Sequence, residues 1–97
     1  MRERKRPPTH PGGILKRQYL GPLELSVAQV AESLRVSRKT FSKIVNGRGA
    51  VTPDMALRLS RAFNTTPQLW LNLQQTYDLW QTSRHSHSWK AVHAVTA

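Results

Sequence analysis

The side chains best suited to bind a ligand gather in one stretch of the chain. They share a positive charge or a polar group that can form hydrogen bonds, and no acidic residue stands between Glu32 and Asp54. Such a cluster suits a polyanion, with nucleic acid the leading candidate. Basic residues also keep proteins in solution, but their clustering favours a binding surface. The predicted surface comprises Ser37, Arg38, Lys39, Thr40, Ser42, Lys43, Asn46 and Arg48.

Two short amphipathic helices, within about residues 26–46, are predicted to position these side chains. Ser26 and Ser37 each precede an apolar pattern of helical period and are suited to cap a helix N-terminus. Each helix is too short to be stable alone, so both must pack against each other and the rest of the chain. The residues expected to face inward are Val27, Val30, Ala31 and Leu34 in the first helix, and Phe41, Ile44 and Val45 in the second.

This pair predicts a helix-turn-helix, because the major groove of DNA admits one helix with polar and basic residues in its leading turn. Arg38 and Lys39 occupy that turn and are suited to read guanine N7 and O6. Gln29, near the start of the first helix, and Arg48, just after the second, are expected to contact phosphates. The turn places Arg35 where a left-handed backbone is needed, at a cost of about 1 kcal/mol for a non-glycine residue.

Three further helices are predicted from start and stop signals. Pro11 is suited to a first helical turn, and Thr52-Pro53 and Thr66-Pro67 each combine a capping residue with such a proline. The three spans are expected at about residues 11–20, 53–63 and 67–81. Their inward residues are expected to be Ile14, Leu15, Tyr19, Met55, Ala56, Leu59, Ala62, Phe63, Leu69, Trp70, Leu73, Tyr77 and Trp80.

The chain of 97 residues suits one small domain, and the predicted fold is all-α with five helices over residues 10–81. Residues 1–9 are basic and contain two prolines, which predicts a flexible arm. Residues 82–97 lack helix-capping signals, which predicts a tail that is mobile or ordered only on binding.

Other functional classes find little support. The five acidic residues are scattered, so no catalytic centre is expected, and cysteine is absent. His85, His87 and His93 match structural zinc sites poorly, and no phosphate-binding GxxxxGK[ST] pattern occurs. We therefore expect no catalytic residue, metal ion or cofactor. No apolar run approaches the roughly 20 residues that span a bilayer, which predicts a cytoplasmic protein with no membrane partner.

Three stretches of the sequence resemble the HigA- and VapI-type antitoxins, a branch of the Xre or lambda-repressor-like helix-turn-helix proteins. They are HPGGILKRQYL, VSRKTFSKIVNGRGAVTPDMALRLSRAF and NTTPQLWLNLQQTYDLWQ, and they cover residues 10–81. The resemblance implies a homodimer that binds double-stranded operator DNA in its own promoter and neutralises a HigB-like toxin, an mRNA-cleaving ribonuclease of the RelE type. It also implies that Arg38, Lys39, Thr40 and Lys43 face the groove.

Two positions depart from the family pattern. Relatives commonly have a phosphate-anchoring glutamine where this chain has Val27, and glycine where it has Arg35. Two alternatives stay open: a toxin-neutralising interaction module whose DNA binding is weak because of Val27 and Arg35, and a solitary Xre-type regulator without a toxin. The fifth helix, together with the tail from Thr82, is the expected dimer surface.

Overall fold

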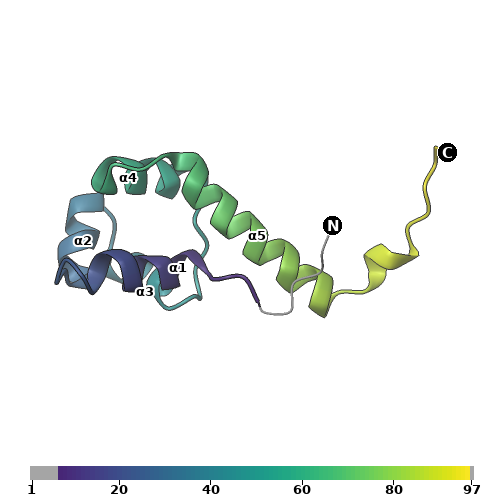
Figure 1. The fold of residues 1–97 in the computed structure, drawn as a ribbon, viewed down its shortest axis with the longest axis horizontal. Coiled ribbons are helices and arrows are strands. Elements are labelled where there is room, and N and C mark those ends of the chain that lie inside the picture. Colours follow the sequence, from purple (N-terminus) through teal and green to yellow (C-terminus); the bar gives the residue numbers. More distant parts are fainter. Residues whose placement is uncertain (1–6, 97) are drawn as a thin grey trace.

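Helices alone form the regular structure of residues 7–96, the part of the chain that the computed structural model describes (Figure 1). The predicted all-α fold with five helices is confirmed, and the pair formed by α2 and α3 lies at one end of the molecule. The elements are α1 (Pro11–Ile14), the π-helical turn η1 (Leu15–Leu20), α2 (Val27–Leu34), α3 (Arg38–Val45), α4 (Pro53–Phe63), α5 (Pro67–His85) and the 3-10 turn η2 (Ser88–Ala91).

The predicted capping residues begin four of these helices. Ser26, Ser37, Thr52 and Thr66 have extended backbones, and each side-chain oxygen accepts a hydrogen bond from the N–H three residues later. Each bond satisfies one of the donors that a helix N-terminus leaves unpaired. Prolines occupy the first turns of α1, α4 and α5, as predicted.

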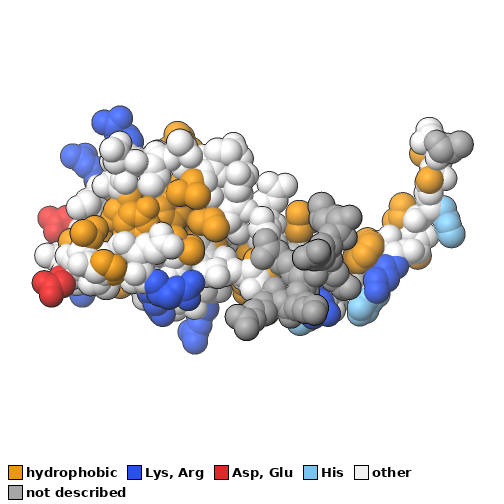
Figure 2. Space-filling model, in the orientation of Figure 1, with side chains coloured by type: hydrophobic (Ala, Val, Ile, Leu, Met, Phe, Trp, Pro, Cys, Tyr) orange, Lys and Arg blue, Asp and Glu red, His pale blue; other side chains and the backbone are white. Residues whose placement is uncertain are grey.

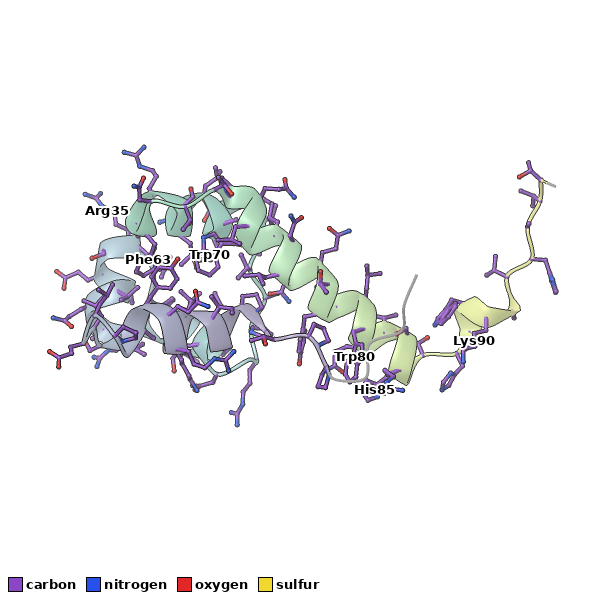
Figure 3. All side chains as sticks on the ribbon, viewed as in Figure 1. Arg35, Phe63, Trp70, Trp80, His85 and Lys90 are labelled. Carbon is purple, nitrogen blue, oxygen red and sulfur yellow. The ribbon has the colours of Figure 1, made fainter. Side chains whose placement is uncertain are left out.

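The core lies between α1, α4 and α5 and extends under the helix pair. Trp70 is fully buried, and the Phe63 ring lies 4.5 Å from that of Tyr19. In Figure 3, Phe63 and Trp70 point into the space between α1 and α4, and Figure 2 shows hydrophobic side chains filling it. The predictions for Ala62 and Leu69 were wrong. Ala62 is exposed, because it lies at the edge between α2 and α4, where no helix covers it. Leu69 is 40% exposed, because it lines an open groove beside Pro8.

The first helix differs from a regular α-helix. The carbonyl oxygen of Lys16 accepts the N–H of Gly21 at 2.9 Å, an i to i+5 bond that widens the helix into a π-helical turn. Gly21 stays right-handed, and the left-handed residue of this connection is Glu24, with φ at 54°. Helical backbone therefore ends at Leu20, where the first helix was predicted to end.

Both ends of the domain differ from the sequence prediction. Pro8, placed in the flexible arm by the sequence prediction, is buried, and it lines a groove together with Leu69 and Leu73 of α5. The rest of the predicted arm, residues 1–6, lies outside the described residues. Helix α5 continues four residues past Gln81 to His85. Arg84 lies over the Trp80 ring at 5.1 Å, a contact that stabilises this last turn.

The length and composition of the helices show whether any of them could span a membrane. Within residues 7–96, every helix is too short or too polar to cross a lipid bilayer.

Candidate nucleic-acid interface

Helix α3 presents a cationic face to solvent and an apolar face to the core. Arg38, Lys39, Thr40 and Lys43 are exposed and Ser42 is half-buried. Phe41 is fully buried, as are nearly all atoms of the other two predicted core residues of this helix. The structure therefore brings the predicted surface together: Ser37 caps α3, and Asn46 and Arg48 follow its C-terminus. A helix with this division of faces has the form required to enter a major groove.

The turn that aims α3 contains the left-handed residue predicted from the sequence. Arg35 has φ 59° and ψ 43°, and its N–H donates to the Glu32 carbonyl oxygen at 3.0 Å. The N–H of Val36 donates to the Ala31 carbonyl oxygen at 3.0 Å. These two bonds form a Schellman-type end to α2, a motif in which glycine usually supplies the left-handed position.

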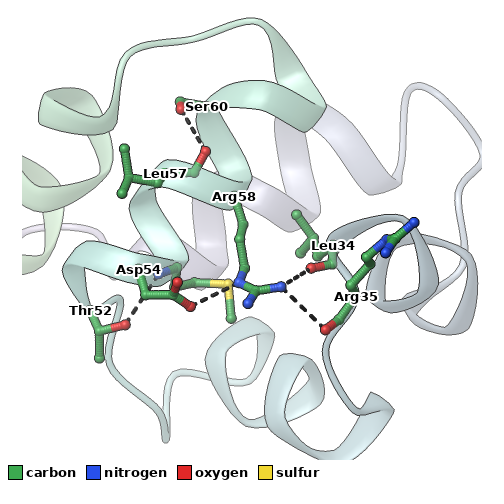
Figure 4. A network of polar contacts seen from close by, with 8 residues as sticks. Leu34, Arg35, Thr52, Asp54, Leu57, Arg58 and Ser60 are labelled. Carbon is green, nitrogen blue, oxygen red and sulfur yellow. Dashed lines mark hydrogen bonds and ion pairs between the residues drawn. The ribbon is translucent and has the colours of Figure 1, made fainter.

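A residue from α4 holds this turn in place. Arg58 Nη1 donates to the carbonyl oxygens of Leu34 at 2.7 Å and Arg35 at 3.2 Å, while Nε donates to Asp54 Oδ2 at 2.8 Å (Figure 4). The cation lies at the negative end of the α2 dipole, where it is favoured. Sequence reasoning missed this contact. The spacing of Asp54 and Arg58 predicts their ion pair, but not the reach of Arg58 to α2.

The loop after α3, which carries Arg48, is held on two sides. His10 Nε2 lies 3.0 Å from the Gly49 carbonyl oxygen, and Gln74 Oε1 accepts the Val51 N–H at 2.9 Å. Gln74 is 6% exposed, and its Nε2 donates to Asp78 Oδ1 at 2.9 Å, so its amide is satisfied. The sequence carried no signal for the contacts of His10 with Gly49 and of Gln74 with Val51, because these residues lie 39 and 23 positions apart.

His10 has its tautomer fixed by its neighbours. Its Nδ1 accepts the Gly12 N–H at 2.9 Å, so the ring proton lies on Nε2 and is donated to Gly49. The ring also packs edge-on against Tyr77, with centroids 4.8 Å apart. Burial lowers the pKa of His10 below 6.5, although the bond to Gly49 and the charge of Asp78 act in the opposite direction. The imidazole is therefore a neutral link between α1, α5 and the Arg48 loop.

Gln29, the predicted phosphate contact of α2, is part of a capping box. Its Oε1 accepts the Ser26 N–H at 2.8 Å, and its own N–H donates to Ser26 Oγ at 3.1 Å. The side chain is exposed, and its NH₂ group carries two hydrogen-bond donors. Gln29 therefore has donors for a phosphate, whereas its oxygen is already engaged.

Two further side-chain pairs lie on the exposed side of α3. Ser37 Oγ accepts the Thr40 N–H at 3.0 Å and donates its proton to Thr40 Oγ1 at 2.8 Å. Asn46 Nδ2 donates to Ser42 Oγ at 3.2 Å. These contacts fix the rotamers of the short polar residues beside the basic ones.

The described residues bring no three His, Cys, Asp or Glu side chains together in a metal-binding group. His85, the last residue of α5, lies far along the molecule from the turn at Arg35 (Figure 3), and His87 follows two residues later.

Known proteins share this architecture. The helix-turn-helix family HTH_3 matches residues 16–70. The chain is 42% identical over 85 residues to the HTH-type transcriptional regulator YbaQ of Escherichia coli K12, covering 88% of this chain and 75% of YbaQ. It is 40% identical over 82 residues to antitoxin HigA-1 of Vibrio cholerae, covering 84% of this chain and 77% of HigA-1. The structure of antitoxin GraA in complex with its operator has a TM-score of 0.87 at 35% identity and full coverage of both chains.

Proposed function

This chain belongs to the helix-turn-helix family as a HigA-type antitoxin, and we propose that it represses its own operon and neutralises a HigB- or RelE-like mRNA interferase. The observation that carries the DNA-binding part is the division of α3 into a buried apolar face and an exposed cationic one. HigA-1 and GraA are named as antitoxins, and GraA is seen with its operator, which supports both parts of the proposal.

In this proposal, the long side chains of the interface divide between two roles. Arg38, Lys39 and Lys43 read base edges from the exposed side of α3, because long cationic side chains there reach guanine N7 and O6. Gln29 and Arg48 hold phosphates on either side, because each lies beyond the part of α3 that enters the groove. The remaining contacts, from short polar side chains near the cationic ones, are Ser37, Thr40, Ser42 and Asn46.

The DNA-binding part is tested by the affinity of the full chain for its own promoter. Fluorescence anisotropy is expected to give binding at least about 1,000-fold tighter to the promoter fragment than to a shuffled fragment of equal length. The logarithm of affinity is also expected to fall linearly with the logarithm of salt concentration. Equal affinity for both fragments would reject a sequence-specific repressor and favour an interaction module with weak DNA binding.

The toxin part is tested separately from DNA binding. A small basic RelE-like reading frame beside this one is expected, and its expression should arrest growth of a host cell unless this chain is co-expressed. Purification of a stable complex between the two proteins would identify the partner. If the neighbouring frame encodes no toxin and growth is unaffected, a solitary Xre-type regulator is the correct function.

A homodimer is proposed because a two-fold pair of α3 helices, about 34 Å apart, reads half-sites one helical turn from each other. The proposed contact surface is the C-terminal half of α5 with the segment after it, where Leu79 is 63% exposed and Trp89 is 48% exposed. Light scattering at micromolar concentration is expected to give twice the monomer mass for the native chain. The Leu79→Glu variant is expected to have the mass of a single monomer. A monomeric native chain that occupies one half-site would contradict the dimer.

A further inference from the structure

The loop between α3 and α4 carries Arg48, but α3 fixes only the first part of this loop. The N–H groups of Arg48 and Gly49 both donate to one carbonyl oxygen of α3, at 2.8 and 2.9 Å. Beyond these bonds, other elements hold the loop: the Gly49 carbonyl oxygen accepts from His10, and the Val51 N–H donates to Gln74. The path of the loop towards α4 is therefore set in part by α5, which lies outside the helix-turn-helix.

Gln74 is oriented on α5 so that its oxygen faces this loop. The side chain is 6% exposed, and its Oε1 accepts the Val51 N–H at 2.9 Å. A side-chain amide can present either its oxygen or its NH₂ group to a neighbour. Asp78, one turn later, accepts the NH₂ group at 2.9 Å, and an ionised carboxylate can only accept. The carboxylate therefore favours the orientation in which the oxygen is left for the loop.

The bond from Gln74 to Val51 cannot be lost without a response from the loop. Val51 is 4% exposed, and a backbone N–H buried at this depth is disfavoured without an acceptor. Without Gln74 Oε1, the loop is expected to shift until water reaches the Val51 N–H. Helix α3 would not follow, because Phe41 anchors it in the core. Arg48, exposed on the loop, would then change its position relative to the side chains of α3.

We propose that Gln74 is a positioning residue for Arg48, which keeps the α3–α4 loop where Arg48 can meet a phosphate while α3 occupies the groove. The side chain of Gln74 is buried, so it acts through the loop rather than by contact with DNA. The proposal rests on the proposed DNA binding and assigns part of its phosphate contact to α5.

Two variants with the net charge of the parent chain test this role. Gln74→Met keeps the length of the side chain and removes the acceptor. Gln74→Glu combined with Asp78→Asn exchanges the two functional groups, so that an oxygen still faces Val51 and the two side chains can still bond. In anisotropy titrations on the promoter fragment, Gln74→Met is expected to bind about tenfold more weakly and to reduce the salt slope by about 1, whereas the exchanged pair stays within about twofold with the parent slope.

A double-mutant cycle separates positioning from a general structural role. Gln74→Met is combined with Arg48→Ala and, as the control, with Lys39→Ala. The loss caused by Gln74→Met is expected to shrink to within about twofold when Arg48→Ala is present, and to stay near tenfold with Lys39→Ala. Circular dichroism verifies that each variant is folded at the temperature of the titration.

A substitution on the surface replaces Gln74→Met if that variant does not fold. Asp78 is exposed, and the ammonium introduced by Asp78→Lys would compete with the Val51 N–H for Gln74 Oε1. Gln75→Lys combined with Asp78→Asn adds the same charge and keeps an acceptor beside Gln74. The salt slope of Asp78→Lys is expected to be lower than that of this control by about 1. Equal slopes would overturn the positioning role.

The remaining outcomes distinguish this role from the proposed function. Binding by folded Gln74→Met within about twofold of the parent chain, or the same loss with and without Arg48→Ala, would overturn the positioning role while the proposed repressor stands. A parent chain that binds neither the promoter nor the shuffled fragment would overturn both.

Discussion

The guanidinium Nη1 of Arg58 lies 2.7 Å from the carbonyl oxygen of Leu34, the last residue of α2. The bond joins α4 to the turn of the helix-turn-helix, and the next carbonyl, that of Arg35, shares the same donor atom at 3.2 Å. Carbonyl groups at a helix C-terminus lack partners within the helix, so a cation from another helix satisfies them. The angle between α2 and α3 is therefore stabilised from outside the motif.

Replacing Arg58 by methionine is expected to lower the free energy of unfolding by about 1 to 2 kcal/mol, because charged hydrogen bonds to the turn are lost while the apolar stem is kept. Urea unfolding followed by circular dichroism at 222 nm measures this loss. The control is Arg61→Met on the same helix, where an exposed side chain is replaced and the change is expected to stay within about 0.5 kcal/mol. Equal losses in both variants would show that the contacts to Leu34 and Arg35 do not stabilise the turn.

Replacing Arg35 by glycine is expected to affect stability and DNA binding in opposite directions. Glycine adopts φ of 59° without the steric cost of a side chain, so the free energy of unfolding is expected to rise by up to about 1 kcal/mol. Loss of a cation next to α3 is expected to reduce the slope of log affinity against log salt by up to about 1. Arg35→Val, which removes the same charge but is β-branched, is expected to lower stability instead. Lower stability in the glycine variant would contradict the strain at this turn.

Replacing Gly12 by alanine is expected to lower the free energy of unfolding by about 3 kcal/mol or more, because α1 meets the end of α3 at this residue. A Cβ there would overlap the Ile44 carbonyl oxygen and come within 2.6 Å of that of Val45, and backbone cannot move aside cheaply. The neighbouring Gly13 is the matched control, since its Cβ would meet side chains and no backbone: the methyl group of Thr9 at 2.9 Å and the guanidinium of Arg17 at 3.6 Å. Gly13→Ala is expected to leave the melting temperature unchanged or higher, and similar losses at both glycines would refute the close contact.

The helices and their starts followed from the sequence because caps, prolines and apolar period are local signals. Ser26, Ser37, Thr52 and Thr66 all cap as expected, and the left-handed turn at Arg35 was also correctly placed. Contacts between distant segments could not be foreseen in this way. A glycine in HPGG predicts a permissive backbone, but that Gly12 faces the end of α3 follows only once both helices are placed.

The candidate interface was predictable in its members but not in their hydrogen bonds. Charge and helical period placed Arg38, Lys39, Thr40 and Lys43 on one exposed surface, and all four are exposed in the structure. The engagement of Gln29 in a capping box and the support of the Arg48 loop by His10 and Gln74 depend on rotamers and tertiary contacts. A single sequence without coordinates contains neither.

The stability of the domain is expected to fall as the pH is lowered from about 7.5 towards 5, in part because of His10. The pKa of His10 lies below 6.5 in the folded state, so the unfolded chain binds a proton more readily than the folded chain does. As the pH falls towards 5, protonation therefore stabilises the unfolded chain relative to the folded one. Protonation would also turn His10 Nδ1 into a donor that faces the Gly12 N–H, so the hydrogen bond between them would be lost. Thermal unfolding at a series of pH values measures the effect.

The matched variants for this pH dependence are His10→Ala and His87→Ala. The first is expected to be less stable at pH 7.5 and to show a shallower decrease towards pH 5, because the titrating group is gone. The second removes an exposed histidine after α5 and is expected to keep the parent slope. An unchanged slope in His10→Ala would assign the pH dependence to other groups.

Arg38 and Arg48 are expected to contribute to operator binding in different ways, although both are exposed arginines of one surface. Arg38 lies in the leading turn of α3 and is proposed to read a base, so Arg38→Ala is expected to cost about 1 to 3 kcal/mol on the operator and much less on random DNA. Arg48 lies beyond α3 on the loop held by His10 and is proposed to contact a phosphate. Arg48→Ala is therefore expected to weaken operator and random DNA alike and to reduce the salt slope by about 1. Anisotropy titrations of both variants on both DNAs at several salt concentrations separate these patterns, and equal losses for Arg38→Ala on operator and random DNA would reject its base-reading role.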